Sequence, residues 1–216
     1  MVAPTEGSGT VANDQSGNGN VGSWQGTPAG TSGYYSAGKV GPYSGSFNGT
    51  NNYVDVGTPI KPSQITISLW FNESSAQSAA CSPVSRGNLN NGSGYFLYVS
   101  NGGGITWSAS YGGGGYQYDS INSTGPTNTW YHLTVVASAS NVQIYINGKL
   151  VASGPRTNLL GYSIGDTDTM IGSALSYAPT LINGSWQPCL GLIDDVRIYN
   201  RALSAAEVQA LYNAEH

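Results

Sequence analysis

Aromatic side chains gather in one stretch of the sequence, beside groups able to hydrogen-bond. Strict alternation over Ile105–Tyr111 places Trp107 and Tyr111 on one face of a strand, and Tyr116 and Tyr118 share a face of the next. Sugars present hydroxyls together with apolar C–H faces, and rings with polar neighbours match both. The polar neighbours are Asn101, Gln117 and Asp119. We predict a carbohydrate-binding surface at Trp107, Tyr111, Tyr116 and Tyr118; the alternative is that Trp107 packs in the core.

Two adjacent carboxylates, Asp194 and Asp195, lie in an apolar run near the C-terminus. In a regular strand their side chains point to opposite faces. A carboxylate beside an apolar core needs a partner, because burial of an unpaired charge is costly. Calcium is one such partner, since it binds carboxylate and carbonyl oxygens. In the alternative, Asp194 caps backbone amides and Asp195 pairs with Arg197 or Arg201.

Groups suited to catalysis are scarce. Glycoside hydrolysis generally needs two carboxylates that flank the scissile bond, and the glutamates are widely separated, at Glu6, Glu73, Glu207 and Glu215. The two histidines are His132 and the terminal His216, too few for a zinc site of histidines. No serine lies in a G-x-S-x-G motif. We therefore predict that the chain is not an enzyme and that His132 is structural.

The composition restricts the class of partner. Charged residues make up 8% of the 216 residues, and the net charge is −4. Seven scattered Lys and Arg residues provide no basic patch for nucleic acid or an anionic membrane. No apolar run is long enough for a membrane-spanning helix. The expected partners are therefore a glycan or a cell-surface protein.

Two cysteines and several glycosylation sequons bear on location. Cys81 and Cys189 form either one disulfide or two buried thiols. The Asn-x-Ser/Thr sequons begin at Asn48, Asn72, Asn91, Asn122 and Asn183. Together with the low charge, these features favour an extracellular or cell-surface setting.

Strand signals recur along the chain, with one helix at its end. The expected strands are 53–56, 65–71, 95–100, 105–111, 116–121, 130–137, 142–146, 149–152, 169–171 and 191–199. Asn147-Gly148 predicts a hairpin with a type I′ turn. Ser204 and Glu207 have capping-box spacing before an apolar helical face. We predict an all-β, two-sheet antiparallel jelly-roll sandwich with one short C-terminal helix, as a single domain over residues 1–216.

An ordered set of motifs resembles the LamG-like jelly-roll family of the concanavalin A-like lectin/glucanase superfamily. Asn13–Asn20 is similar to the family's D-x-S-G-N-G-N loop, and Ser46–Val56 to its F-D/N-G-x-x-D/N-Y-V turn. Gly191–Tyr212 resembles its closing strand and helix. Shorter likenesses are found at 66–71, 130–132 and 144–151, so the resemblance spans residues 13–212.

The resemblance implies a structural calcium ion held by Asp14, the Gly49 carbonyl and Asp194. It also places Trp70 and Trp130 at structural core positions. Glucanases of this fold carry E-x-D-x-x-E on one strand, a pattern that this chain lacks.

The resemblance also bears on the cysteines. In similar jelly rolls the strands at 65–71 and 191–199 are antiparallel neighbours, which would bring Cys81 and Cys189 to the same end and allow a disulfide.

Two functions remain open from the sequence. The first is a non-catalytic, extracellular carbohydrate-binding module with a structural calcium ion. The second is a protein–protein adhesion or structural module of a larger cell-surface protein, because a surface rich in Tyr, Asn and Ser suits both kinds of contact.

Overall fold

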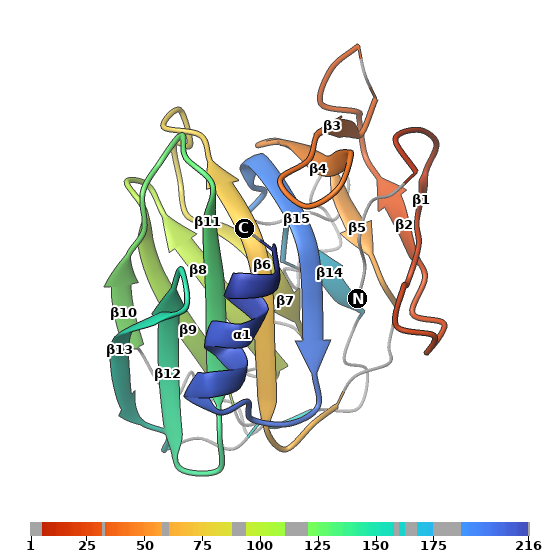
Figure 1. Ribbon diagram of the computed structural model, residues 1–216. Coiled ribbons are helices and arrows are strands. Elements are labelled where there is room, and N and C mark those ends of the chain that lie inside the picture. Colours follow the sequence, from red (N-terminus) through yellow and green to blue (C-terminus); the bar gives the residue numbers. More distant parts are fainter. Residues whose placement is uncertain are drawn as a thin grey trace.

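Two antiparallel β-sheets pack face to face in the computed structural model (Figure 1), which describes residues 6–31, 33–57, 61–87, 94–110, 121–157, 160–162, 168–174 and 187–215. The first sheet has eight strands in the spatial order β1 (Val11–Ala12), β2 (Gly22–Gln25), β5 (Tyr53–Asp55), β14 (Thr169–Ile171), β7 (Cys81–Arg86), β8 (Gly94–Ser100), β9 (Gly104–Ser110) and β10 (Ile121–Thr124). The second has seven, in the order β13 (Lys149–Pro155), β12 (Asn141–Ile146), β11 (Tyr131–Ala137), β6 (Ile65–Glu73), β15 (Leu190–Tyr199), β4 (Tyr43–Asn48) and β3 (Tyr35–Ala37). The predicted two-sheet jelly-roll sandwich is confirmed.

The core lies between the sheets and follows from alternation along the strands. In β6 the side chains of Ile65, Ile67, Leu69 and Phe71 are all fully buried within it. The intervening residues of β6 face away from the core. They are buried as well, because the C-terminal helix covers that outer face.

The helix α1 (Ala205–Glu215) lies across the outer face of the seven-stranded sheet, over β6, β11 and β12 (Figure 1). The predicted capping box is present: the Ser204 amide donates to Glu207 Oε2 at 2.8 Å, and the Glu207 amide donates to Ser204 Oγ at 3.3 Å. Val208 is fully buried against Val136 and Tyr145 of the sheet. Local capping and an apolar face together fix where the helix begins and where it docks.

A buried disulfide joins Cys81 and Cys189, whose Cα atoms are 4.7 Å apart across 108 residues of sequence. The predicted pairing is thus confirmed. β6 and β15 are antiparallel neighbours, with Gly191 opposite Glu73, so the two cysteines lie at the same end.

Two local predictions had different outcomes. Asn147 and Gly148 have φ of 51° and 75°, as a type I′ turn requires. The strand β7, by contrast, was not predicted. It contains Pro83, which cannot donate to the ladder, and its register with β8 shifts between Cys81 and Val84.

Most of the strand predicted at 116–121 lies outside the described residues; β10 begins at Ile121.

Candidate functional site

Trp107 is a core residue, so the prediction that it binds carbohydrate is wrong. Its side chain is fully buried, and its ring stacks on Tyr95 with centroids 6.0 Å apart. Ile105 and Ala109, on the same face of β9, are fully buried too. Alternation correctly grouped these side chains on one face, but that face is the one turned toward the other sheet. The other predicted sugar-binding residues, Tyr111, Tyr116 and Tyr118, lie outside the described residues.

Asp14, predicted as a calcium ligand, closes its own loop. Its Oδ1 accepts from the Ser16 amide at 2.9 Å, and its Oδ2 accepts from Ser16 Oγ and from the Asn20 amide, both at 2.8 Å. Partial burial acts to raise the pKa of Asp14, but these hydrogen bonds outweigh it and hold the pKa well below the usual range.

Asp194, the second predicted ligand, is buried and binds backbone amides. Its Oδ2 accepts from the amides of Lys39 and Val40, both at 2.8 Å, and its Oδ1 accepts from the Asp195 amide at 2.8 Å. Burial raises the pKa of Asp194 although these three amides favour the charged form. This amide capping is the arrangement that the sequence left open as the alternative to a metal.

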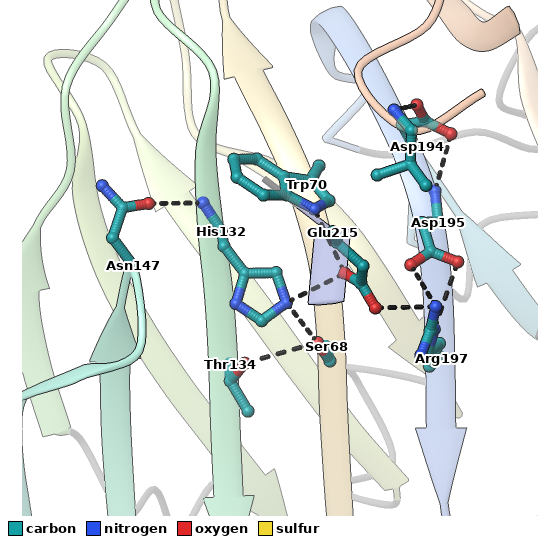
Figure 2. A network of polar contacts seen from close by, with 10 residues as sticks. Ser68, Trp70, His132, Thr134, Asn147, Asp194, Asp195, Arg197 and Glu215 are labelled. Carbon is teal, nitrogen blue, oxygen red and sulfur yellow. Dashed lines mark hydrogen bonds and ion pairs between the residues drawn. The ribbon is translucent and has the colours of Figure 1, made fainter. Parts of the chain in front are cut away.

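The prediction that Asp194 and Asp195 point to opposite faces is wrong. A bulge interrupts β15 between Asp194 and Arg197, and Asp195 has a φ of 46°. Asp195 therefore forms an ion pair with Arg197 at 2.8 Å, on the side of the sheet that α1 covers (Figure 2). A bulge breaks the period of two from which the alternation was inferred.

The third predicted ligand, Gly49, directly follows β4, and its amide donates to the carbonyl of Cys189, just before β15, at 2.8 Å. Asp194 lies four residues beyond Leu190, the residue that pairs with Asn48. Within the described ranges no cluster of three or more His, Cys, Asp or Glu side chains is present. The predicted set has two carboxylates and one carbonyl, and a calcium ion held by Asp14, the Gly49 carbonyl and Asp194 stays a prediction from the resemblance.

A buried polar network fastens α1 to the seven-stranded sheet (Figure 2). Glu215 Oε1 pairs with Arg197 at 2.6 Å, while Glu215 Oε2 accepts from Trp70 Nε1 at 3.2 Å and lies 3.6 Å from His132 Nε2. Burial raises the pKa of Glu215 to about 7 and lowers the pKa of His132 to about 4. The network therefore holds a neutral imidazole at neutral pH.

Ser68, His132 and Glu215 have the residue types of an acyl-transfer triad but not its geometry. Ser68 Oγ lies 2.8 Å from His132 Nε2, the same nitrogen that faces Glu215. A triad needs its acid on the other ring nitrogen, to orient the base, and His132 Nδ1 is buried with no hydrogen-bond partner in the described part of the chain. Ser68 and His132 are each 1% exposed, so a substrate could not reach them. The cluster therefore serves to dock the helix.

A groove of about 500 Å³ opens beside this network. We call it the Trp130 groove, and it is lined by Lys39, Trp70, Asn72, Asn128, Thr129, Trp130, Asn147 and Tyr212. Trp70 forms its floor: the ring is 3% exposed and lies 6.0 Å from the Tyr212 ring of α1, centroid to centroid. Trp130 and Tyr212 are partly exposed at its sides. An aromatic surface with amide side chains around it is thus present, at a different place from the one predicted.

Amide groups and one cation surround these rings. The Asn72 side chain makes no hydrogen bond with any other described residue, so it is available to a ligand. Asn147 Oδ1 accepts from the His132 amide at 2.9 Å, which leaves its amino group to donate elsewhere. The ammonium of Lys39 lies 4.6 Å from the centre of the Trp70 ring.

The loop that carries Trp130 is anchored by Asn128. Its amide donates to the Glu73 carbonyl at 2.7 Å, and its side chain binds both the amide and the hydroxyl of Ser75. The family resemblance placed Trp130 at a core position, but Trp130 precedes β11 and is partly exposed. The spacing of two residues between Trp130 and His132 could have indicated this, because residues two apart along an extended chain lie on the same face.

The comparison with known families agrees with this architecture. Residues 48–209 match the family described as the concanavalin A-like lectin/glucanases superfamily, so the chain belongs to that superfamily. No curated protein sequence matches the chain.

Three solved structures share the fold at low identity. The Ruminococcus gnavus IT-sialidase CBM40 bound to α2,3-sialyllactose is 20% identical, with a TM-score of 0.59 over 70% of this chain and 83% of that one. Domain 4 of AbnA, a GH43 extracellular arabinanase from Geobacillus stearothermophilus, in complex with arabinotriose, is 22% identical, with a TM-score of 0.65 over 92% and 91%. The receptor-binding domain of botulinum neurotoxin D is 17% identical, with a TM-score of 0.66 over 99% of this chain and 51% of that one. At these identities the likeness establishes the fold alone.

Proposed function

We propose that this chain is a carbohydrate-binding module and that an oligosaccharide binds in the Trp130 groove. The observation that carries the proposal is the partly exposed Trp130 ring in one groove with the Asn72 amide, which no described side chain or backbone group engages. The ring offers an apolar surface for sugar C–H groups, and the amide hydrogen-bonds to hydroxyls. Two neighbours in fold, the sialidase CBM40 and the arabinanase domain, were solved with sugars, which supports this class of ligand.

The groove is suited to binding because its floor is held in place before any ligand arrives. Trp70 is fixed by its hydrogen bond to Glu215 and by Tyr212 beside it. Asn128 anchors the loop that carries Trp130. A site that is already ordered loses less conformational entropy on binding.

The proposal extends to the setting of the module. We infer a non-catalytic, extracellular domain spanning residues 1–216, consistent with a disulfide, which persists in oxidising compartments. Among the described residues no helix is long and apolar enough to cross a membrane.

The test is a glycan-array screen followed by titration calorimetry with the best neutral oligosaccharide. Trp130→Ala should weaken binding by about tenfold or more, as expected when an aromatic anchor is removed. Asn72→Ala should weaken it by a smaller factor. Tyr43→Ala is the matched control, because Tyr43 is 40% exposed on β4 but does not line the groove.

Two results would overturn the proposal. If the wild type binds no glycan, the adhesion function left open by the sequence becomes the better account. If Tyr116→Ala abolishes binding while Trp130→Ala leaves it unchanged, the chain binds sugars at the surface predicted from the sequence instead.

A further inference from the structure

Lys39 places a cation in the Trp130 groove, where no described carboxylate pairs with it. Its ammonium lies over the Trp70 ring, 4.6 Å from the centroid. Among the described residues Lys39 forms no ion pair. The position is partly buried, so the ammonium is already partly desolvated by the ring.

The backbone around Lys39 is tightly fixed. The amides of Lys39 and Val40 both bind Asp194 Oδ2, which ties this loop to β15. The loop closes with the Gly38 amide donating to the Pro42 carbonyl at 3.2 Å. A side chain at Gly38 would place its Cβ 2.8 Å from the carbonyl oxygen of Tyr43, so the turn requires glycine. Asp194 thus positions the loop that presents Lys39.

Among the described residues that line the groove, Lys39 is the one that carries a charge. Glu215, behind Trp70, is 4% exposed and paired with Arg197. The carboxylate of Asp194 is 1% exposed and occupied by three amides. Arg197 is paired with both Asp195 and Glu215. In a chain with net charge −4, the groove therefore presents a positive charge to a ligand.

We propose that the groove selects an acidic oligosaccharide, whose carboxylate pairs with Lys39 while a sugar ring packs on Trp130. The inference rests on the proposed function and adds a ligand class to it. A sialic acid and a uronic acid share this chemistry, because each carries a carboxylate on a sugar ring.

The experiment measures dissociation constants by calorimetry for matched ligands. One arm compares α2,3-sialyllactose with lactose, and the other compares trigalacturonate with its fully methyl-esterified form. In at least one arm the acidic ligand should bind about fivefold tighter at low salt, the scale of a partly exposed ion pair. The preference should shrink as salt screens the pair. The arm with the larger preference identifies the source of the carboxylate.

Three variants assign the effect to Lys39. Lys39→Met should abolish the acidic preference, measured as the ratio of acidic to neutral affinity, while Lys39→Arg should retain it. Lys149→Met, at an exposed lysine outside the groove, is the matched control. Asp194→Asn should lower the ratio of acidic to neutral affinity, a readout that a general loss of folded protein would not move.

The outcomes separate the two proposals. Equal binding of acidic and neutral ligands, lost in Trp130→Ala, would keep the carbohydrate-binding function and overturn the acidic selectivity. An acidic preference that survives in Lys39→Met would overturn the role of Lys39. Failure of the wild type to bind any of the four ligands would overturn the selectivity, while the glycan screen decides the function itself.

Discussion

The indole Nε1 of Trp70 donates to Oε2 of Glu215 at 3.2 Å, and this bond joins the floor of the Trp130 groove to the last residue of α1 that the structure describes. The same carboxylate pairs with Arg197 on β15. One side chain therefore fastens the end of the helix and fixes the ring beneath the candidate ligand (Figure 2).

Glu215→Ala should destabilise the protein by about 1–3 kcal/mol, because it leaves the buried Trp70 Nε1 without its acceptor and removes one partner of Arg197. Thermal unfolding measures the loss. Asn213→Ala, at an exposed position on the same helix, is the control and should change the melting temperature little. Equal effects of the two substitutions would mean that Glu215 does not fasten the helix.

Glu73 should make the fold less stable as pH rises. It is fully buried, neither carboxyl oxygen has a hydrogen-bond partner among the described residues, and burial raises the pKa from 4.5 to about 7. The folded state then holds the proton more tightly than the unfolded state does. Its contribution is fully present below the unfolded pKa and is lost as pH rises through about 7.

Glu73→Gln stays neutral at every pH. Its free energy of unfolding should therefore be close to that of the wild type near about pH 4, and should exceed it near about pH 8 by at most about 3 kcal/mol. Burial raises the pKa of Glu215 as well, so part of the loss of stability with rising pH should remain in this variant. Glu207→Gln is the control: the hydrogen bond from Arg201 lowers the pKa of Glu207 to about 2, so its contribution to stability has the opposite pH dependence and its removal should not stabilise the protein at the higher pH. A Glu73→Gln curve parallel to wild type would contradict the assignment.

The disulfide should contribute strongly to stability. It closes a loop spanning 108 residues, for which the chain-entropy argument gives roughly 4–5 kcal/mol as an upper figure. Reductant, or the double substitution Cys81→Ser with Cys189→Ser, should lower the melting temperature markedly. Titration of the denatured, unreduced protein should detect no free thiol, and two reactive thiols would refute the pairing.

Asp194 tests whether hydrogen bonds or an ion account for its burial. Asp194→Ala removes the acceptor of three amides and should destabilise the fold equally in excess EDTA and in excess Ca²⁺. The calcium site implied by the family resemblance makes the opposite prediction: EDTA should lower the melting temperature of the wild type, and Asp194→Ala should abolish that response. Melting wild type and variant in both conditions decides between the two.

Much of the fold could be predicted because it depends on local patterns. The alternation of β6, the Asn147-Gly148 turn and the Ser204–Glu207 capping box each reflect the geometry of a single segment. The disulfide followed from the strand pairing that the family resemblance implies. The strand β7 was not predicted because it contains Pro83. It forms because the neighbouring strands β8 and β14 pair with it.

The candidate site was harder to predict because it depends on contacts between distant segments. Alternation places Trp107 with Ile105 but does not say which face of the strand is buried. No sequence pattern around Asp195 predicted the bulge there. The Trp130 groove exists only where α1, the loop at Lys39 and the loop at Asn128 meet over β6, so no single stretch of sequence contains it.

The most direct test of carbohydrate binding in the Trp130 groove is a glycan titration followed by the NMR signals of the tryptophan indole N–H groups. The chain has five tryptophans, and the Trp130 signal can be assigned by its loss in Trp130→Phe. We predict that the Trp130 signal shifts in a saturable manner, whereas those of the buried Trp24 and Trp107 stay in place. A glycan that binds without moving the Trp130 signal would contradict the account.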